Sequence, residues 1–298
     1  MAKIVQCIPN FSEGRDKSVI EALEEIAKSV PGVMLVDVSC DPSHNRSVFT
    51  LVGDPDGMVE AAFLLAEKAS KLIDMTKHTG EHPRMGATDV IPFVPIRDIT
   101  MDDCIELAKK LGARMWEELS IPSFLYEHAA SVPERQNLAN VRKGQFEGMP
   151  EKLLEDSWAP DFGDRKIHKS AGITAIGARP PLIAYNVNLN TSNLEVANAI
   201  AKMVRAASGG YKYVKAIGVM LEERNIAQVS INMVNLDANP LYRVFEAIRF
   251  EAKRWGVEII GSEIVGLAPA KALIDCAEYY LQIEDFDYKN QVLENHLI

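Results

Sequence analysis

Apolar residues follow two different periods along the first half of the chain, and each period predicts one type of element. Apolar residues at helical spacing predict one helix after Asp16 and another after Asp54 and Pro55. Continuous or alternating apolar runs predict strands over residues 4–9, 33–38, 46–53 and 90–95. The predicted order is strand, helix, strand, strand, helix, strand, which is the order of a ferredoxin-like unit.

The second half of the chain repeats this order of elements, although its residues show no close repeat of the first half. Helices are predicted after Asn193 and after Pro240. Strands are predicted over residues 182–189, 214–221, 226–234 and 257–265. The dipeptide Pro180-Pro181 is a natural boundary. We therefore expect an α+β protein of two ferredoxin-like α/β-sandwich subdomains, residues 1–179 and 180–298.

Further elements are predicted outside these two series. A capping box at Thr100 and Asp103 predicts a helix that runs to about residue 119. The polar region that follows contains one predicted helix, over residues 151–157. A strand over 174–179 completes the first half, and two trailing helices are predicted over 269–282 and 289–296.

Amide side chains gather on two predicted strands of the second half. Asn186 and Asn188 alternate with apolar residues on one strand, and Gln228, Ser230 and Asn232 do so on another. Since side chains alternate between the two faces of a strand, each polar set lies on one face. A solvent-facing sheet surface is one interpretation. Asn is unfavourable in strands, however, so we expect these side chains to line a substrate cleft between the two halves.

Residues 77–89 form the segment with the densest candidate chemistry. They hold two His, one Glu, one Asp, one Lys and one Arg, with Gly80, Pro83 and Gly86 among them. Gly and Pro at these spacings predict an irregular loop with a defined path, which is where catalytic residues are commonly placed. His82 is the leading candidate for general acid–base catalysis, because imidazole titrates near neutral pH.

The same loop contains candidates for supporting roles. Glu81 or Asp89 is expected to orient His82, and the sequence does not distinguish between them. His78 and His82 are spaced like a helical metal pair, but Gly and Pro break the helix and the HExxH order is absent. We therefore predict no metal site. Asn10, Asn45 and Arg46 close strand ends and are candidates for binding a carboxylate or amide, with helix caps or turn bonds as the alternative for the two Asn.

Composition narrows the class of function more than it narrows the fold. The 298 residues carry a net charge of −10, which argues against general nucleic-acid binding but allows anionic small substrates. No apolar run approaches the roughly 18 residues of a spanning helix, and the N-terminus lacks a signal-peptide core. The four cysteines are scattered without a CxxC pair. We expect a cytoplasmic protein with no nucleic-acid or membrane partner.

Several of these segments together resemble the glutamate formiminotransferases, including the formiminotransferase part of formiminotransferase-cyclodeaminase. The similar segments are residues 7–14 (CIPNFSEG), 45–46 (NR), 80–87 (GEHPRMGA), 150–153 (PEKL), 158–163 (WAPDFG) and 265–267 (VGL). The resemblance implies transfer of a formimino group from N-formimino-L-glutamate to N5 of tetrahydrofolate, in histidine degradation and one-carbon metabolism. It also implies two subdomains facing each other across a folate tunnel, and a homodimer.

The resemblance also assigns roles to residues. It implies that His82 is catalytic and that tetrahydrofolate is a co-substrate, with no metal. Arg46, Arg84 and Arg179 become candidates for binding substrate carboxylates, and Lys166, His168 and Lys169 for the folate glutamyl tail. The implied folate-binding segment consists of Gly163, Asp164, Arg165, Lys166, Ile167, His168, Lys169, Ser170, Ala171 and Gly172.

Three other functions stay open from the sequence. The same site is suited to transfer of a formyl group from 5-formyltetrahydrofolate to glutamate. Paired ferredoxin-like units also serve as sensors, so a folate-binding module without turnover is a second alternative. A metal-dependent amidohydrolase is the third. Assays with each donor, folate-binding calorimetry and treatment with a chelator separate these alternatives.

Overall fold

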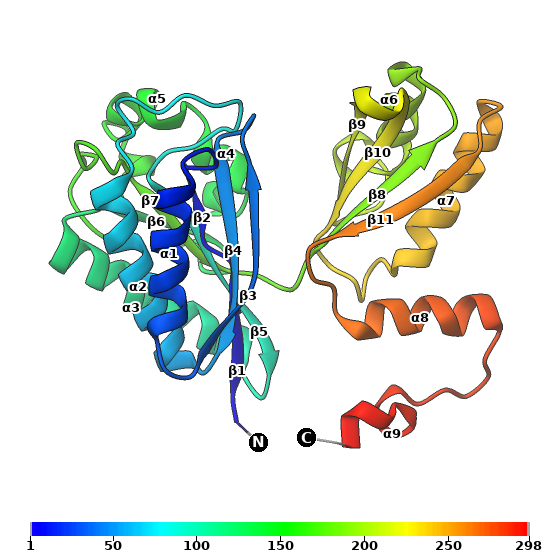
Figure 1. Ribbon diagram of the computed structural model, residues 1–298, viewed down its shortest axis with the longest axis horizontal. Helices are drawn as coiled ribbons and strands as arrows, with labels where there is room; N and C mark the ends of the chain where they lie inside the picture. Colours follow the sequence, from blue (N-terminus) through cyan, green and yellow to red (C-terminus); the bar gives the residue numbers. More distant parts are fainter. Residues whose placement is uncertain (1, 297–298) are drawn as a thin grey trace. The chain divides into compact units, whose positions relative to one another are not determined.

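The computed structural model describes residues 2–296 of the chain. The chain divides into two compact units, unit 1 (Met1–Pro180) and unit 2 (Pro181–Ile298). Each unit contains a β-sheet with helices packed on it (Figure 1). The protein therefore belongs to the predicted α+β class, with two separate sheets. None of the helices among residues 2–296 is long and apolar enough to cross a membrane.

The sheet of unit 1 is built around a strand that is interrupted once. Its strands are β1 (Ile4–Cys7), β2 (Asn10–Phe11), β3 (Val33–Asp41), β4 (Arg46–Gly53), β5 (Thr88–Arg97), β6 (Ser123–Glu127) and β7 (Thr174–Ala178). Both β1 and β2 pair with β4 on one side and with β5 on the other. Pro9 lies in the gap between them, and its missing N–H removes a ladder hydrogen bond. The strand predicted over residues 4–9 is therefore two short strands in line.

The remaining strands extend this sheet on both sides. Strand β3 pairs antiparallel with β4 at one edge. On the other side, β7 pairs parallel with β5, and β6 pairs parallel with β7. Parallel neighbouring strands need long connections. The connection from β6 to β7 contains short helices, described below, and then the predicted folate segment. This topology brings residues 163–172 back to β5, the strand that follows residues 77–89, here called the His82 loop.

Three long helices cover one face of the sheet of unit 1. They are α1 (Lys17–Ser29), α2 (Pro55–Leu72) and α3 (Met101–Leu119), which lie side by side (Figure 1). Each begins at the predicted residue, because the side chains of Asp16, Asp54 and Thr100 accept hydrogen bonds from the first helical turn. Their apolar faces form the main core with β1, β4 and β5. The face of each helix was predictable from its period.

The prediction of a helix over residues 151–157 is wrong. The structure instead has α4 (Leu138–Arg142) and α5 (Gln145–Lys152), followed by a 3-10 turn at Asp156–Trp158. These short helices bury Val141 and Met149 in a second core cluster of unit 1. Lys152 ends α5 and donates to the carbonyl groups of Asn140 and Val141. Tertiary contacts of this kind leave no periodic pattern in the sequence.

Unit 2 has the predicted order of elements. These are β8 (Ile183–Leu189), α6 (Leu194–Val204), β9 (Val214–Leu221), β10 (Ile226–Met233), α7 (Leu241–Arg254) and β11 (Ile259–Val265). The strands are all antiparallel, in the order β11-β8-β10-β9, so the first and third strands are central. Helices α6 and α7 pack in one core cluster with the apolar side chains of the sheet. Helices α8 (Ala270–Leu281) and α9 (Tyr288–Gln291) follow.

The polar residues of β8 and β10 share one face of this sheet, as predicted. Asn188 pairs with Gln228, and Asn186 pairs with Ser230. The Gln228 amide donates to Oδ1 of Asn188 at 2.8 Å and to Oε1 of Glu263 at 3.0 Å. Asn186 donates to the same Glu263 oxygen at 3.0 Å. The result is a hydrogen-bonded network of amides around one carboxylate, on the face opposite the helices.

Candidate active site

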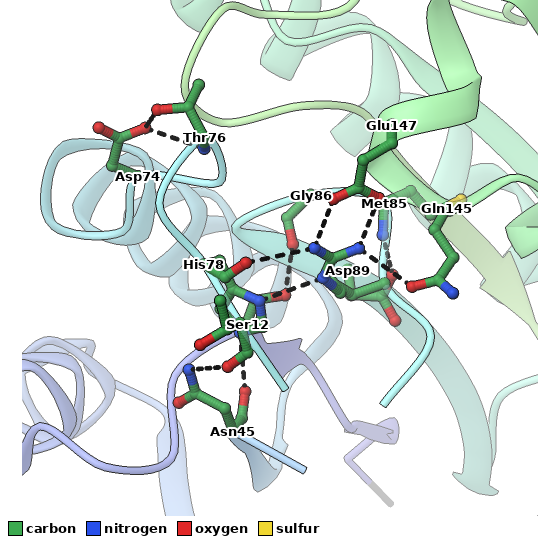
Figure 2. Close-up of polar contacts among 12 residues, drawn as sticks. Ser12, Asn45, Asp74, Thr76, His78, Met85, Gly86, Asp89, Gln145 and Glu147 are labelled. Atoms are coloured by element: carbon green, nitrogen blue, oxygen red, sulfur yellow. Dashed lines mark hydrogen bonds and ion pairs between the residues drawn. The ribbon is translucent and has the colours of Figure 1, made fainter. Parts of the chain in front are cut away.

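The His82 loop is fastened to its own unit by hydrogen bonds to backbone groups. The Ser12 hydroxyl donates to the carbonyl of Gly86 at 2.8 Å, and the Asn45 amide donates to the carbonyl of Thr79 at 2.9 Å. Figure 2 shows Ser12 and Asn45 reaching the loop from neighbouring segments. The loop is therefore anchored at both ends, as its Gly and Pro content predicts.

The predicted folate segment packs directly against this loop. Gly86 and Gly172 form an isolated β-bridge, and the N–H of Ile173 donates to the carbonyl of Met85 at 3.1 Å. Gly172 has a φ of +74°, and a Cβ there would lie 2.2 Å from the Met85 oxygen. Only glycine fits such a close approach. Residues 163–172 and the His82 loop thus meet within unit 1.

The His82 ring is held in one protonation form by its neighbour. A guanidinium nitrogen of Arg46 lies 3.1 Å from Nε2 of His82. Because a guanidinium only donates, Nε2 accepts and the ring proton sits on Nδ1. Burial, followed by the positive charges of Arg142 and Arg46, lowers the pKa of His82 to about 3. The ring is therefore neutral at pH 7, and the nitrogen left for a ligand is a hydrogen-bond donor.

Two arginines flank His82, and only one of them has a carboxylate partner. Arg142 on α4 donates to Oδ2 of Asp89 at 2.9 and 2.5 Å, and Asp89 accepts the N–H of Met85 through its other oxygen. The Nε of Arg46 is buried and has no hydrogen-bond partner among the described residues. Burial and the charge of Arg142 lower the pKa of Arg46. A half-buried cation with a free donor fits an anionic ligand.

A second histidine stands beside His82. The Nδ1 of His44 lies 2.7 Å from Oδ2 of Asp41, and the ring centroids of His44 and His82 are 6.3 Å apart. The other oxygen of Asp41 accepts the backbone N–H groups of Ser43 and His44, each at 2.9 Å. These bonds lower the pKa of Asp41, so its carboxylate is ionised and fixed in place.

The two parts of the chain match two family models. Residues 4–179 match the formiminotransferase domain, N-terminal subdomain, and residues 184–297 match the formiminotransferase domain. The chain belongs to the formiminotransferase family. Glutamate formimidoyltransferase of Streptococcus pyogenes serotype M1 is 68% identical over the whole of both chains. The protein of the same name from Thermoplasma acidophilum is 49% identical over 99% of this chain and 97% of its own.

Longer relatives match over part of their length. Formimidoyltransferase-cyclodeaminase of Rattus norvegicus is 46% identical over 95% of this chain and 53% of its own length. The formiminotransferase region of that protein therefore corresponds to nearly all of this chain. Family membership confirms the resemblance found from the sequence motifs.

The predicted orienting partners of His82 have other contacts. Asp89 is paired with Arg142, and Glu81 is exposed. Among residues 2–296, the hydrogen-bond partner of the His82 ring is Arg46. Arg142 was not identified from the sequence, because it lies in a short polar helix far along the chain. The Asp41 and His44 pair was not identified from the sequence either, although a carboxylate three residues before a His was a usable signal.

The two predicted asparagines of unit 1 make local backbone bonds. The Asn10 amide donates to the carbonyl of Ile8 at 3.0 Å. Asn45 has a φ of +48°, and its side-chain oxygen accepts the N–H of Gly14 at 2.9 Å. The Nε2–H of His78 donates to the Asn45 carbonyl, 3.1 Å away. In this structure both asparagines fix the loops around His82.

Every N–H group of the Arg84 side chain has a hydrogen-bond acceptor in this structure. Its guanidinium donates to both oxygens of Glu147 at 2.7 and 2.8 Å and to the Gln145 side chain at 3.0 Å. Its remaining donors reach Nδ1 and the carbonyl of His78 at 3.1 and 3.4 Å. Figure 2 shows Glu147 and Gln145 reaching this group from α5. All five N–H groups thus have acceptors, and Arg84 joins the loop to α5.

Arg179 lies at the end of β7, away from these contacts. It donates to the carbonyl of Pro180 at 3.1 Å. Burial lowers its pKa and raises that of the neighbouring Tyr126 to about 12. Tyr126 therefore keeps its proton at neutral pH.

The folate segment contains both structural and exposed side chains. Ile167 packs in the second core cluster, and Nδ1 of His168 accepts the N–H of Ala171 at 3.0 Å. Arg165 pairs with Asp156 at 2.7 Å on the surface. The side chains exposed to solvent are those of Asp164, Arg165, Lys166 and Lys169. No group of His, Cys, Asp or Glu within residues 2–296 is arranged to hold a metal ion.

Proposed function

We propose that this protein is a glutamate formimidoyltransferase that moves the formimino group of N-formimino-L-glutamate to N5 of tetrahydrofolate. The observation that carries the proposal is a cluster of side chains in a chain of the formiminotransferase family. This His82 cluster consists of His82, Arg46, Arg142, His44 and Asp41. There, Arg46 is a half-buried cation with a free N–H next to a neutral imidazole. A substrate carboxylate supplies the acceptor that Arg46 lacks, and this places the formimino group beside His82.

Folate is proposed to bind along the segment that packs on the His82 loop. Gly163 and Gly172 both have positive φ values, so the segment follows a path that most side chains disfavour. Lys166 and Lys169 are exposed on it. In a protein with a net charge of −10, such local positive charge is needed to hold an anionic glutamyl tail. Tetrahydrofolate acts here as a co-substrate.

The amide network of unit 2 is proposed to be a second substrate-binding surface. Asn186 and Asn188 lie on the sheet face that no helix of that unit covers, with Glu263 beside them. Amides and a carboxylate together offer donors and acceptors to the polar edge of a pterin ring. We also propose that the protein works as a homodimer in the cytoplasm, and native mass measurement tests the dimer.

A product assay with two donors tests the proposed function. Purified protein is given N-formimino-L-glutamate with tetrahydrofolate in one reaction, and 5-formyltetrahydrofolate with glutamate in another. Mass spectrometry then identifies the folate product and the released amino acid. The proposal predicts formiminotetrahydrofolate and free glutamate in the first reaction, at a rate far above that of the second. Faster formyl transfer, or folate binding without either product, would contradict it.

A further inference from the structure

The two histidines of the His82 cluster offer a ligand opposite kinds of ring nitrogen. On this basis we propose that His44, oriented by Asp41, takes the proton from N5 of tetrahydrofolate and returns it to the departing glutamate nitrogen. His82 then acts as a neutral hydrogen-bond donor instead of a base. The inference rests on the proposed function and divides the work of its active site between two residues.

His44 has the arrangement of an oriented general base. The ionised Asp41 carboxylate accepts from Nδ1 of His44 at 2.7 Å, which keeps the ring proton on that nitrogen. Asp41 is itself held by two backbone N–H groups of the same turn. The lone pair of His44 is thus on Nε2, and no described residue hydrogen-bonds to it. The side chain is 45% exposed, so a substrate can reach it.

His82 has the reverse arrangement. Arg46 donates to its Nε2 at 3.1 Å, so the lone pair is occupied by a guanidinium. The nitrogen that remains carries a proton. Adding a second proton would place an imidazolium against Arg46 and Arg142, both positively charged. A ring in this setting donates a hydrogen bond well but accepts a proton poorly.

One base is enough for both proton transfers of the reaction, from N5 and to the glutamate nitrogen. N5 attacks the formimino carbon of the protonated amidine, the C–N5 bond forms, and the C=N electron pair moves to the formimino nitrogen. Nε2 of His44 takes the proton that N5 loses. The bond from carbon to the glutamate nitrogen then breaks as that nitrogen receives the proton from His44. His82 donates a hydrogen bond to the formimino nitrogen, which holds the displaced electron pair in the tetrahedral intermediate. That pair re-forms the C=N bond as the glutamate nitrogen leaves.

Glutamine substitutions separate a donor from a base, because an amide donates a hydrogen bond but does not take up a proton. We expect His44→Gln to lower kcat at least about 100-fold, whereas His82→Gln keeps a tenth or more of wild-type kcat. His128→Gln, at an exposed position outside the cluster, is the matched control. The reverse order of activities, or full activity of His44→Gln, would overturn the assignment.

Chemical rescue decides the case in which both glutamine variants are inactive. Added imidazole is expected to restore activity to His44→Ala, whose site is open to solvent, and not to His82→Ala. Rescue of His82→Ala alone would overturn the inference. Circular dichroism of each variant shows that the fold is kept, so that loss of activity is not loss of structure.

A measurement without substrate tests the inference independently of the proposed function. Nitrogen-15 NMR is expected to show that the neutral form of each ring carries its proton on Nδ1. In Asp41→Asn the amide group would donate to Nδ1 of His44 and move the ring proton to Nε2, while the turn keeps its oxygen acceptor. A proton on Nε2 of His44 in the wild type would refute the inference. Inactivity of the wild type would instead refute the proposed function.

Discussion

His82 owes its chemistry to the residues around it more than to its place in the loop. Burial and two guanidinium groups keep its ring neutral, and the hydrogen bond from Arg46 fixes its tautomer. Its candidacy was visible in the sequence because the ionisable residues of the loop are consecutive. Its environment was not visible, because His44 and Arg46 come from the turn between β3 and β4 and its end, and Arg142 comes from α4. The spacing of residues along the chain does not predict such long-range contacts.

The lowered pKa of His82 predicts a pH dependence of stability. The unfolded chain binds a proton at His82 below its ordinary pKa of 6.5, while the folded chain binds it only near pH 3. The unfolded state therefore holds more protons between these values, and the free energy of unfolding falls as pH drops from 6.5 toward 3. His82→Gln should show a shallower fall between pH 6.5 and 5 in urea titrations. Parallel profiles for variant and wild type would contradict the assignment.

At the scale of elements, the His82 loop depends on a buried ion pair from α4. Asp89 is 2% exposed at its side chain and is the carboxylate partner of Arg142. We expect Asp89→Asn to lower the free energy of unfolding by about 3–5 kcal/mol, since it leaves a buried cation without its counter-charge. Asp156→Asn removes a surface pair with Arg165 and should cost at most about 1 kcal/mol. Equal losses in the two variants would count against a structural role for the buried pair.

The contact between the loop and the folate segment depends on glycine. A Cβ at Gly172 would meet the Met85 carbonyl, and the residue has a left-handed backbone conformation. Gly172→Ala should therefore destabilise the protein by at least about 2 kcal/mol and raise the KM for tetrahydrofolate. Gly148→Ala is the control, because a Cβ there has open space within α5 and should stabilise by about 0.5–1 kcal/mol. Thermal unfolding of both variants measures the difference.

At the scale of the whole molecule, the order of elements was predictable because both halves follow strict periods. Nearly every long helix and strand begins within a few residues of its predicted start. The polar sets of β8 and β10 were also placed correctly on one face. The region between β6 and β7 was not, because its helices are short and are held by contacts from Arg84 and Lys152. Local sequence does not report such contacts.

The proposal that the amide network of unit 2 binds folate makes a prediction for Asn186. Asn186→Ala should raise the KM for tetrahydrofolate about tenfold, the value of one hydrogen bond, with little change in kcat. Lys202→Ala, at an exposed position on the helix side of the same unit, should leave both constants unchanged. Steady-state kinetics with each substrate varied in turn provides the measurement. An unchanged KM in Asn186→Ala would argue against folate binding at this network.

The most direct test of the central claim is the rate of formimino transfer by the wild type and by His82→Ala in the same assay. N-formimino-L-glutamate and tetrahydrofolate are supplied at saturation, and formiminotetrahydrofolate is measured over time. We predict clear turnover by the wild type and a kcat lower by about 100-fold or more in the variant, as for loss of a preorganised donor. Turnover by His82→Ala at the wild-type rate, or no transfer by the wild type, would contradict the account.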